Sequence, residues 1–204
     1  MTFLARGPVA RAFAVLRDEG PRSFWFKLAS ELGYRRLLVL ERPLTQPIPE
    51  VAPRIAVRLE VLAEAQADDY IAFRPQAARA RVLARLHGGH RCYVARHADL
   101  VVSSCWSATG NASSEYLQCA IDLTVGDAYL FDAFTLPAYR GQRIGLALCM
   151  RQLRDLQQAG YRRAIRATVP ENVVALRAHA RGGFRPVGMI RRFKIGPWQK
   201  TFRR

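Results

Sequence analysis

The sequence predicts a mixed α/β or α+β fold, in which helices flank one sheet. Along the second half of the chain, a group of predicted strands is followed by strand, helix, strand, helix and strand. Half of the 204 residues are hydrophobic and 10% are aromatic, which is enough for a sizeable core. No apolar run approaches the roughly 18 residues of a membrane-spanning helix. We therefore expect one main domain with a small appendage.

The appendage is predicted at the N-terminus. Residues 8–33 carry aliphatic and aromatic side chains at helical spacing, interrupted at Gly20-Pro21. Residues 37–40 form a short apolar run typical of a strand, and four prolines within 42–53 are typical of an extended linker. These features predict a basic amphipathic extension over residues 1–50 and the main domain over 51–204.

Two roles remain open for the extension. Trp25 and Phe24 beside Arg22 and Lys27 are suited to an anionic membrane surface. They are equally suited to packing on the main domain, and the strand at 37–40, which needs a neighbour, favours packing.

The main domain divides into strands and helices by its hydrophobic periodicity. Predicted strands cover residues 55–61, 91–96, 100–109, 115–123, 128–136, 163–169 and 184–195, and predicted helices cover 63–87, 143–159 and 172–181.

Charge is concentrated in the last third of the chain. The whole chain has 32 basic and 16 acidic residues, and residues 136–204 hold 16 of the basic and 2 of the acidic ones. Such a surface attracts phosphates, nucleic acid or anionic lipid. The stretch from Arg191 to Arg204 also interleaves aromatic residues, which is typical either of single-strand binding or of a basic edge strand and tail. The second interpretation is favoured, so nucleic acid is the less expected partner.

The four cysteines, Cys92, Cys105, Cys119 and Cys149, include no CxxC pair. A compact zinc site is therefore not expected, and we expect no metal. Four buried thiols fit a reducing cytoplasm, with a peripheral membrane position as the alternative if the extension contacts lipid.

The segment with the clearest chemistry runs from Leu136 to Gly145, between a predicted strand and a predicted helix. The first turn of that helix has unpaired backbone N–H groups and a partial positive charge. Gly141 and Gly145 allow a ligand to approach the backbone, and Arg140 and Arg143 add full charges. This combination predicts a pyrophosphate site. It lacks the GK[ST] of the nucleotide P-loop and the GxGxxG of dinucleotide folds.

Arg140-Gly141-Gln142-Arg143-Ile144-Gly145 resembles the acyl-CoA pyrophosphate loop, R/Q-x-x-G-x-G/A, of the GCN5-related N-acetyltransferase (GNAT) family. Residues 170–184 resemble that family's next motif, an Asn followed by a helix and a Gly-Phe strand start. The resemblance is clear over 128–195, extends plausibly from about residue 54 and does not cover 1–50. It implies a largely antiparallel central sheet and acetyl-CoA or another acyl-CoA as co-substrate.

The resemblance also implies which residues contact CoA. The strand before the loop would splay from its neighbour and pair with the pantetheine arm through Phe134, Thr135 and Leu136. Asn172 would lie near the same arm, although an Asn at this position also serves as a helix cap. Arg143 replaces the middle glycine of the motif, and we therefore expect ordinary backbone angles at 143.

Three residues are candidates for catalysis. His179 matches the position where the family often has a tyrosine that reprotonates the CoA thiolate, and a histidine can transfer a proton near neutrality. A general base is also useful, and the available carboxylates are Asp132, on the predicted cofactor-side strand, and Glu115, on its predicted neighbour. In a strictly alternating strand, Asp132 shares a face with Leu130 and Phe134.

The main functional hypothesis is an acyl-CoA-dependent N-acyltransferase, with acetyl as the expected acyl group and a primary amine of unknown identity as acceptor. The amine would attack the thioester directly in a ternary complex. Two alternatives remain: a non-catalytic basic adaptor that binds nucleic acid or anionic membrane, and a transferase of long acyl chains in which the N-terminal extension covers the lipid.

Overall fold

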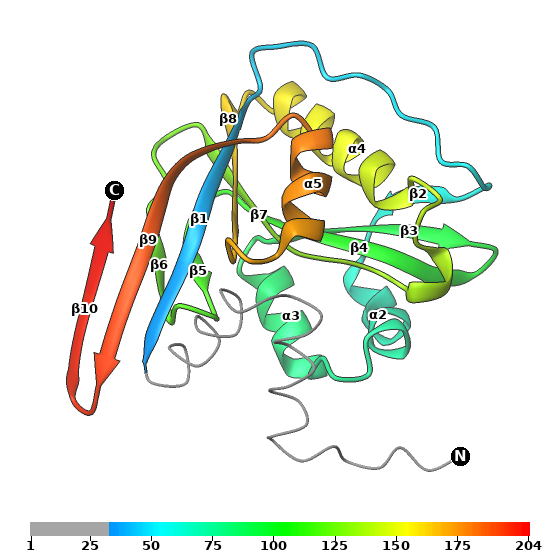
Figure 1. Ribbon diagram of the computed structural model, residues 1–204. Coiled ribbons are helices and arrows are strands. Elements are labelled where there is room, and N and C mark those ends of the chain that lie inside the picture. The colour runs from blue at the N-terminus through cyan, green and yellow to red at the C-terminus, as the bar shows by residue number, and fades with distance from the viewer. Residues whose placement is uncertain (1–32) are drawn as a thin grey trace, which may run out of the picture.

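The computed structural model describes residues 33–204, and the helices expected within residues 8–33 lie outside this part of the chain. Its main feature is one eight-stranded sheet with the order β10-β9-β1-β8-β7-β4-β3-β2 (Figure 1). Its strands are β1 (Tyr34–Pro43), β2 (Arg58–Val61), β3 (Arg91–His97), β4 (Leu100–Ala108), β7 (Asp127–Thr135), β8 (Arg163–Thr168), β9 (Arg185–Ile195) and β10 (Trp198–Arg203). All neighbouring pairs in this sheet are antiparallel except β7 and β8, which are parallel. The expected mixed, largely antiparallel sheet is confirmed.

Helices cover both faces of the sheet. On one face lie α4 (Ile144–Gln158) and α5 (Val173–Arg181), and the other face carries α2 (Ala67–Phe73) and α3 (Arg79–His87) (Figure 1). Alternate residues of β3 and β4 belong to the two cores: Val94 and Trp106 pack with α2 and α3, whereas Ala95 and Cys105 pack with α4. A hairpin of β5 (Ala112–Ser114) and β6 (Cys119–Ile121) adds a third cluster against β1, β7 and β8.

The strand expected at residues 37–40 is real and longer than expected. β1 lies between β8 and β9 and pairs with both. Leu37 and Leu40 are both buried, on opposite faces, because side chains three residues apart on a strand point to opposite sides of the sheet. A boundary at residue 50 would therefore separate a central strand from its own sheet, and the described part of the predicted extension belongs to the main domain.

The proline-rich segment after β1 also packs on the core. Leu44 and Ile48 are buried in the cluster under α4, and the Gln157 side chain of that helix donates a hydrogen bond to the carbonyl of Leu44. The prolines favour an extended chain, and here that chain is anchored by its apolar residues rather than left free as a linker.

Four other elements differ from expectation. The strand expected over 115–123 is a turn followed by the short β6. The helix expected over 63–87 is divided into α2 and α3 at Pro75, because proline breaks the backbone ladder of a helix. Ile55 and Val57 pack against the core, but the strand expected over 55–61 pairs regularly only from Arg58. The C-terminal tail forms β10 at the edge of the sheet, with Trp198 and Phe202 exposed. In residues 33–204, no helix is long and apolar enough to cross a membrane.

Candidate active site

The central opening of the sheet lies between its two parallel strands. β7 and β8 pair only over their first three residues, from Asp127 opposite Arg163 to Tyr129 opposite Ile165. Both strands continue beyond this point, β7 to Thr135 and β8 to Thr168, without pairing with one another. The splay that the sequence resemblance implied is therefore present, and it leaves one backbone edge of β7 without a partner strand in the described chain.

The residues expected beside the pantetheine arm lie along this free part of β7. Their other edge is occupied by β4, since Thr135 lies opposite Ser103 and the Leu136 amide donates to the Val102 carbonyl at 2.9 Å. The Ser103 hydroxyl also donates to the Phe134 carbonyl at 3.0 Å. β7 is thus held rigidly on one side and open on the other, as a strand must be to accept an extended ligand.

The loop that follows β7 leads to the N-terminus of α4. No side chain caps this end of the helix within the described chain, and its first intrahelical bond runs from the Ala147 amide to the Arg143 carbonyl at 2.9 Å. Arg140 and Arg143 are exposed beside it. The segment before β2 supports the loop, because the Arg54 amide donates to the Gln142 carbonyl at 2.9 Å. Free amides and a helix dipole meet there beside two exposed arginines, a combination that is suited to a pyrophosphate.

The expectation of ordinary backbone angles at Arg143 is wrong. Arg143 has φ of 60° and ψ of 8°, in the left-handed region, and Gly141 has φ of 79°. The loop must turn sharply from the extended backbone of Arg140 into the first turn of α4, so the geometry of the turn outweighs the steric preference of the side chain.

We expect Arg143→Gly to leave the fold as stable as before or more stable, by up to about 1 kcal/mol. A residue with a side chain costs about 1–2 kcal/mol of stability in the left-handed conformation, and glycine avoids this cost. Glycine in turn lowers stability by roughly 0.5–1 kcal/mol because its flexible unfolded chain loses more entropy on folding. Arg140→Gly is the matched variant, because Arg140 has a φ of −69° and gains nothing from glycine. Chemical denaturation of both variants measures the difference. An equal loss of stability in the two would contradict the strain at 143.

On the face of the sheet that carries α2 and α3, the opening leads to a cavity of about 1020 Å³. Tyr129 and Phe131 of β7 and Ala167 and Thr168 of β8 line its floor. Its walls come from α3, from the β5–β6 hairpin and from the segment between α2 and α3. Its lining includes His90 and the charged residues Arg74, Arg81, Arg85, Glu115 and Asp132. A ligand in this cavity would therefore reach the separated strands from the side opposite α4.

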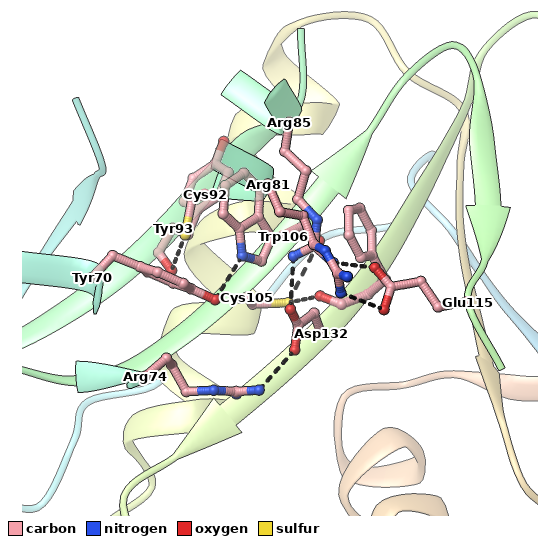
Figure 2. Close-up of polar contacts among 11 residues, drawn as sticks. Tyr70, Arg74, Arg81, Arg85, Cys92, Tyr93, Cys105, Trp106, Glu115 and Asp132 are labelled. Carbon is pink, nitrogen blue, oxygen red and sulfur yellow. Dashed lines mark hydrogen bonds and ion pairs between the residues drawn. The ribbon is translucent and has the colours of Figure 1, made fainter. Parts of the chain in front are cut away.

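An ionic network organises the wall of the cavity (Figure 2). Arg85 is the central cation and donates to Asp132 at 2.8 Å and to Glu115 at 3.0 Å. Arg74 approaches the second Asp132 oxygen at 3.4 Å, and Arg81 approaches Glu115 at 3.3 Å. Arg85 also lies 5.2 Å from the ring centroid of Trp106, which is fully buried. Both candidate bases are thus brought together through one shared arginine.

The two carboxylates differ in their setting. Asp132 lies at a β-bulge, where it has φ of 49° and where Asp132 and Ala133 together lie opposite Cys105. Because of this bulge, Asp132 shares its face with Phe134 but not with Leu130, which packs under α4, so the expected strict alternation is wrong. Glu115 lies in the turn after β5 rather than on a neighbouring strand of the main sheet, and its side chain is 63% exposed.

Residues 59–184, more than half of the chain, match the model of the acetyltransferase (GNAT) family. The chain belongs to this family. A GCN5-related N-acetyltransferase from Sphaerobacter thermophilus has a similar structure, with a TM-score of 0.56 and 16% identity over 89% of this chain and 56% of that chain. A GNAT-family acetyltransferase from Novosphingobium aromaticivorans gives a TM-score of 0.55 and 16% identity, covering 78% of this chain and 65% of that one.

A third similar structure is the aminoglycoside N-acetyltransferase AAC(6')-Iy in complex with CoA, with a TM-score of 0.52 and 18% identity over 63% of this chain and 91% of that chain. At these identities the likeness shows the GNAT fold. The chain spans only 56% and 65% of the first two structures. A sequence search of curated proteins found no significant match.

His179 lies on the other side of the GNAT sheet from the carboxylates. It belongs to α5, and its Nδ1 lies 3.3 Å from Nη1 of Arg166. Burial, together with the charge of Arg166, lowers the pKa of His179 to about 4. The ring is therefore neutral at pH 7, with Nδ1 accepting from the guanidinium and Nε2 carrying the proton. Its role as an acid stays a prediction, and it would have to act as a neutral imidazole.

Acidification is expected to destabilise the fold through His179. Its folded pKa of about 4 lies below the ordinary value of 6.5, so the unfolded chain binds this proton more readily. The stabilising contribution is complete above pH 6.5 and is lost as the pH falls towards 4. The free energy of unfolding should therefore fall less over this window in His179→Gln than in the parent protein. NMR titration of the ring checks the cause, and a ring that titrates near 6.5 would contradict it.

Asn172 caps the helix that the sequence motif predicted. Its Oδ1 accepts from the Ala175 amide at 3.0 Å, in the first turn of α5. This contact explains the residue without a ligand, and its expected position near the CoA arm stays a prediction.

Sequence reasoning did not single out the arginines of the site. Arg74 and Arg85 belong to stretches that were interpreted only as an Arg-rich helix, and His90 was given no role, although it lines the cavity. Nothing in the sequence around Arg74, Arg85 and His90 distinguished them from exposed residues nearby. Arg166 did have a signal, since it interrupts the otherwise apolar run from Ala164 to Ala167.

Proposed function

We propose that this GNAT protein is an acyl-CoA-dependent N-acyltransferase, with acetyl as the expected acyl group. The observation that carries the proposal is the opening between β7 and β8, which joins the uncapped N-terminus of α4 to the charged cavity on the opposite face. One face of the opening is suited to a long, phosphate-bearing ligand, and the other is suited to a polar acceptor. A transferase requires two such entrances that meet at one place.

On the first face, we infer that the loop from Arg140 to Gly145 binds the pyrophosphate of CoA. The pantetheine arm, which carries amide groups, would take the place of a strand beside Phe134 and Thr135. This binding places the thioester near the bulge at Asp132. Strand amides there are suited to polarise its carbonyl, because fixed donors in a dry site stabilise a developing oxyanion.

On the second face, the primary amine of the acceptor would enter through the cavity. The nitrogen attacks the thioester carbon, the C–S bond breaks, and its electron pair remains on sulfur while the amine loses a proton. Asp132 lies on the part of β7 that is separated from β8. Because Arg74 and Arg85 both contact it, its first task would be to hold and orient the amine, and transfer of the proton would follow through water. Glu115 would contribute charge at the rim.

The acceptor is proposed only as a polar primary amine. One structural relative carries the name aminoglycoside N-acetyltransferase, and the alternation of arginines and carboxylates in this cavity fits an acceptor with several polar groups. Three of the four free thiols are buried, whereas Cys119, which was also expected to be buried, is half-buried. Free thiols support a place in the cytoplasm.

Calorimetric titration with acetyl-CoA and with CoA tests the proposal, followed by an acceptor panel of amino sugars, polyamines and peptides read by thiol release. We expect both nucleotides to bind and at least one amine to accelerate thiol release. A longer acyl-CoA in the same titration tests chain length. The proposed enzymatic function would be overturned if the protein bound neither CoA nor acetyl-CoA. Binding of single-stranded RNA or anionic vesicles by the same protein would favour an adaptor.

A further inference from the structure

A buried guanidinium lies where the two central strands separate. Arg166 is the next residue of β8 after the last pair with β7, Tyr129 with Ile165. Its side chain points to the α4–α5 face and reaches past β7 to Cys105 of β4, with an Nη2 to Sγ distance of 3.4 Å. Only 7% of the residue is exposed. The cation therefore lies at the apex of the opening, on the face of the CoA loop.

Neutral groups surround this cation. Besides Cys105, its partners are Cys149 of α4, whose Sγ lies 3.4 Å from Nη2, and Nδ1 of His179 on α5. Burial raises the pKa of the Cys105 thiol to about 11, and the pKa of His179 is about 4, so neither is charged near neutrality. The ring of Phe184 lies 5.1 Å from the guanidinium.

No carboxylate of residues 33–204 pairs with Arg166. None of the ion pairs in this part of the chain includes it, and its Nε is buried without a hydrogen-bond partner. Arg42 of β1, which donates to the carbonyl of Gly182, is also a cation. An uncompensated buried charge is costly, and an arginine cannot discharge by losing its proton. Its charge is therefore available to an anion that enters the opening.

We propose that Arg166 is a catalytic residue that binds the thiolate of CoA as it leaves. The proposal rests on the N-acyltransferase function above and adds a group that the sequence motif does not contain. A thiolate is the anion that acyl transfer from CoA creates. Its charge appears when the C–S bond breaks and the electron pair remains on sulfur. Arg166 supplies the opposite charge without giving up a proton.

This assignment also explains the neutral His179. Its Nδ1 accepts from Arg166 and so orients the guanidinium, which makes the histidine a positioning residue in this arrangement. Protonation of the sulfur can then follow departure from the site. The permanent cation favours the thiolate over the thiol, so bound CoA should have a lowered thiol pKa.

The test compares the affinities of CoA and acetyl-CoA between pH 6.5 and 9, under reducing conditions. Acetyl-CoA has no thiol to ionise, so the ratio of its dissociation constant to that of CoA isolates the sulfur. If the complex favours the thiolate, the ratio of the two dissociation constants rises with pH. Each unit by which binding lowers the thiol pKa adds about tenfold to this rise. The groups around Arg166 do not produce this rise in the ratio. His179 titrates near 4, Cys105 near 11 and Tyr129 of β7 near 12, all outside the pH range of the experiment. Cys149 and Arg42 are present in both complexes.

Variants assign the effect to Arg166. Arg166→Met should give a ratio that is flat with pH, and Arg166→Lys, which keeps a cation, should retain part of the rise. Arg177→Met, at an exposed arginine of α5, is the control for loss of one positive charge and should behave like the parent protein. If Arg166→Met does not fold, the parent protein and Arg166→Lys still decide the question.

The two proposals can fail separately. A flat ratio in a parent protein that binds both nucleotides would overturn the role of Arg166 and leave the N-acyltransferase standing. A full rise in folded Arg166→Met would have the same consequence. Absence of binding by either nucleotide would overturn the proposed function and this inference with it.

Discussion

A chain that begins at Val51 is expected to aggregate and to show no cooperative melting of the native fold. This deletion removes β1, which pairs with β8 on one side and β9 on the other. It also removes Leu40, Leu44 and Ile48 from the cluster under α4. The loss breaks the sheet into two pieces and exposes apolar surface and two unpaired edges, both of which promote aggregation.

A chain that begins at residue 33 is the matched control, since it keeps every described element. Solubility, circular dichroism and thermal melting of the two chains give the comparison. The position of β1 would be contradicted if the 51–204 chain were soluble and melted at the temperature of the 33–204 chain. Vesicle binding of the full chain and of the 33–204 chain tests separately whether residues 1–32 contact an anionic membrane, because salt should weaken such binding.

Alanine at both Arg140 and Arg143 is expected to lower the affinity for CoA by at least about tenfold, and by up to about ten-thousandfold if both side chains bind phosphate. Loss of a hydrogen bond to a charged group costs about 1.5–3 kcal/mol. Both residues are exposed beside the N-terminus of α4, so the fold should survive. Calorimetry with CoA measures the loss, and higher salt should reduce the difference from the parent protein.

Two further variants sharpen this result. Arg177→Ala with Arg181→Ala removes two exposed arginines from α5 and should change CoA affinity little, which excludes a general effect of net charge. Arg143→Gly removes a single charge and releases the left-handed strain, so it separates the side chain from the backbone amides. If the folded Arg140–Arg143 double variant bound CoA with unchanged affinity, the assignment of the pyrophosphate loop would fail.

The sequence was informative about the start of α4 and of α5, which depend on local backbone. The glycines and arginines of 140–145 and the amphipathic helix after them identified the α4 terminus, because a turn and a helix start are set by neighbouring residues. The family motif then implied the splay of β7, which the three-residue pairing with β8 confirms. The same locality explains the correct prediction of Asn172 at a helix start.

Features that depend on distant partners were missed or misjudged. The bulge at Asp132 arises from its register against Cys105, and the network around Arg85 needs β7, α3 and the β5–β6 turn to meet. Prolines near residue 50 predicted a free linker because local propensity does not show that Leu44 and Ile48 are buried by α4. The left-handed angle at Arg143 shows the converse: a local preference was clear, and the turn overrode it.

The central place of β1 also sets the order of events during synthesis. Leu38 leaves the ribosome more than a hundred residues before its partners, Thr168 on β8 and Met189 on β9. Until then the strand has no sheet to join, and such long-range pairings form slowly. The nascent chain therefore carries an unpaired apolar strand until β8 and β9 are made, and the two halves of the sheet are joined only after these strands have emerged.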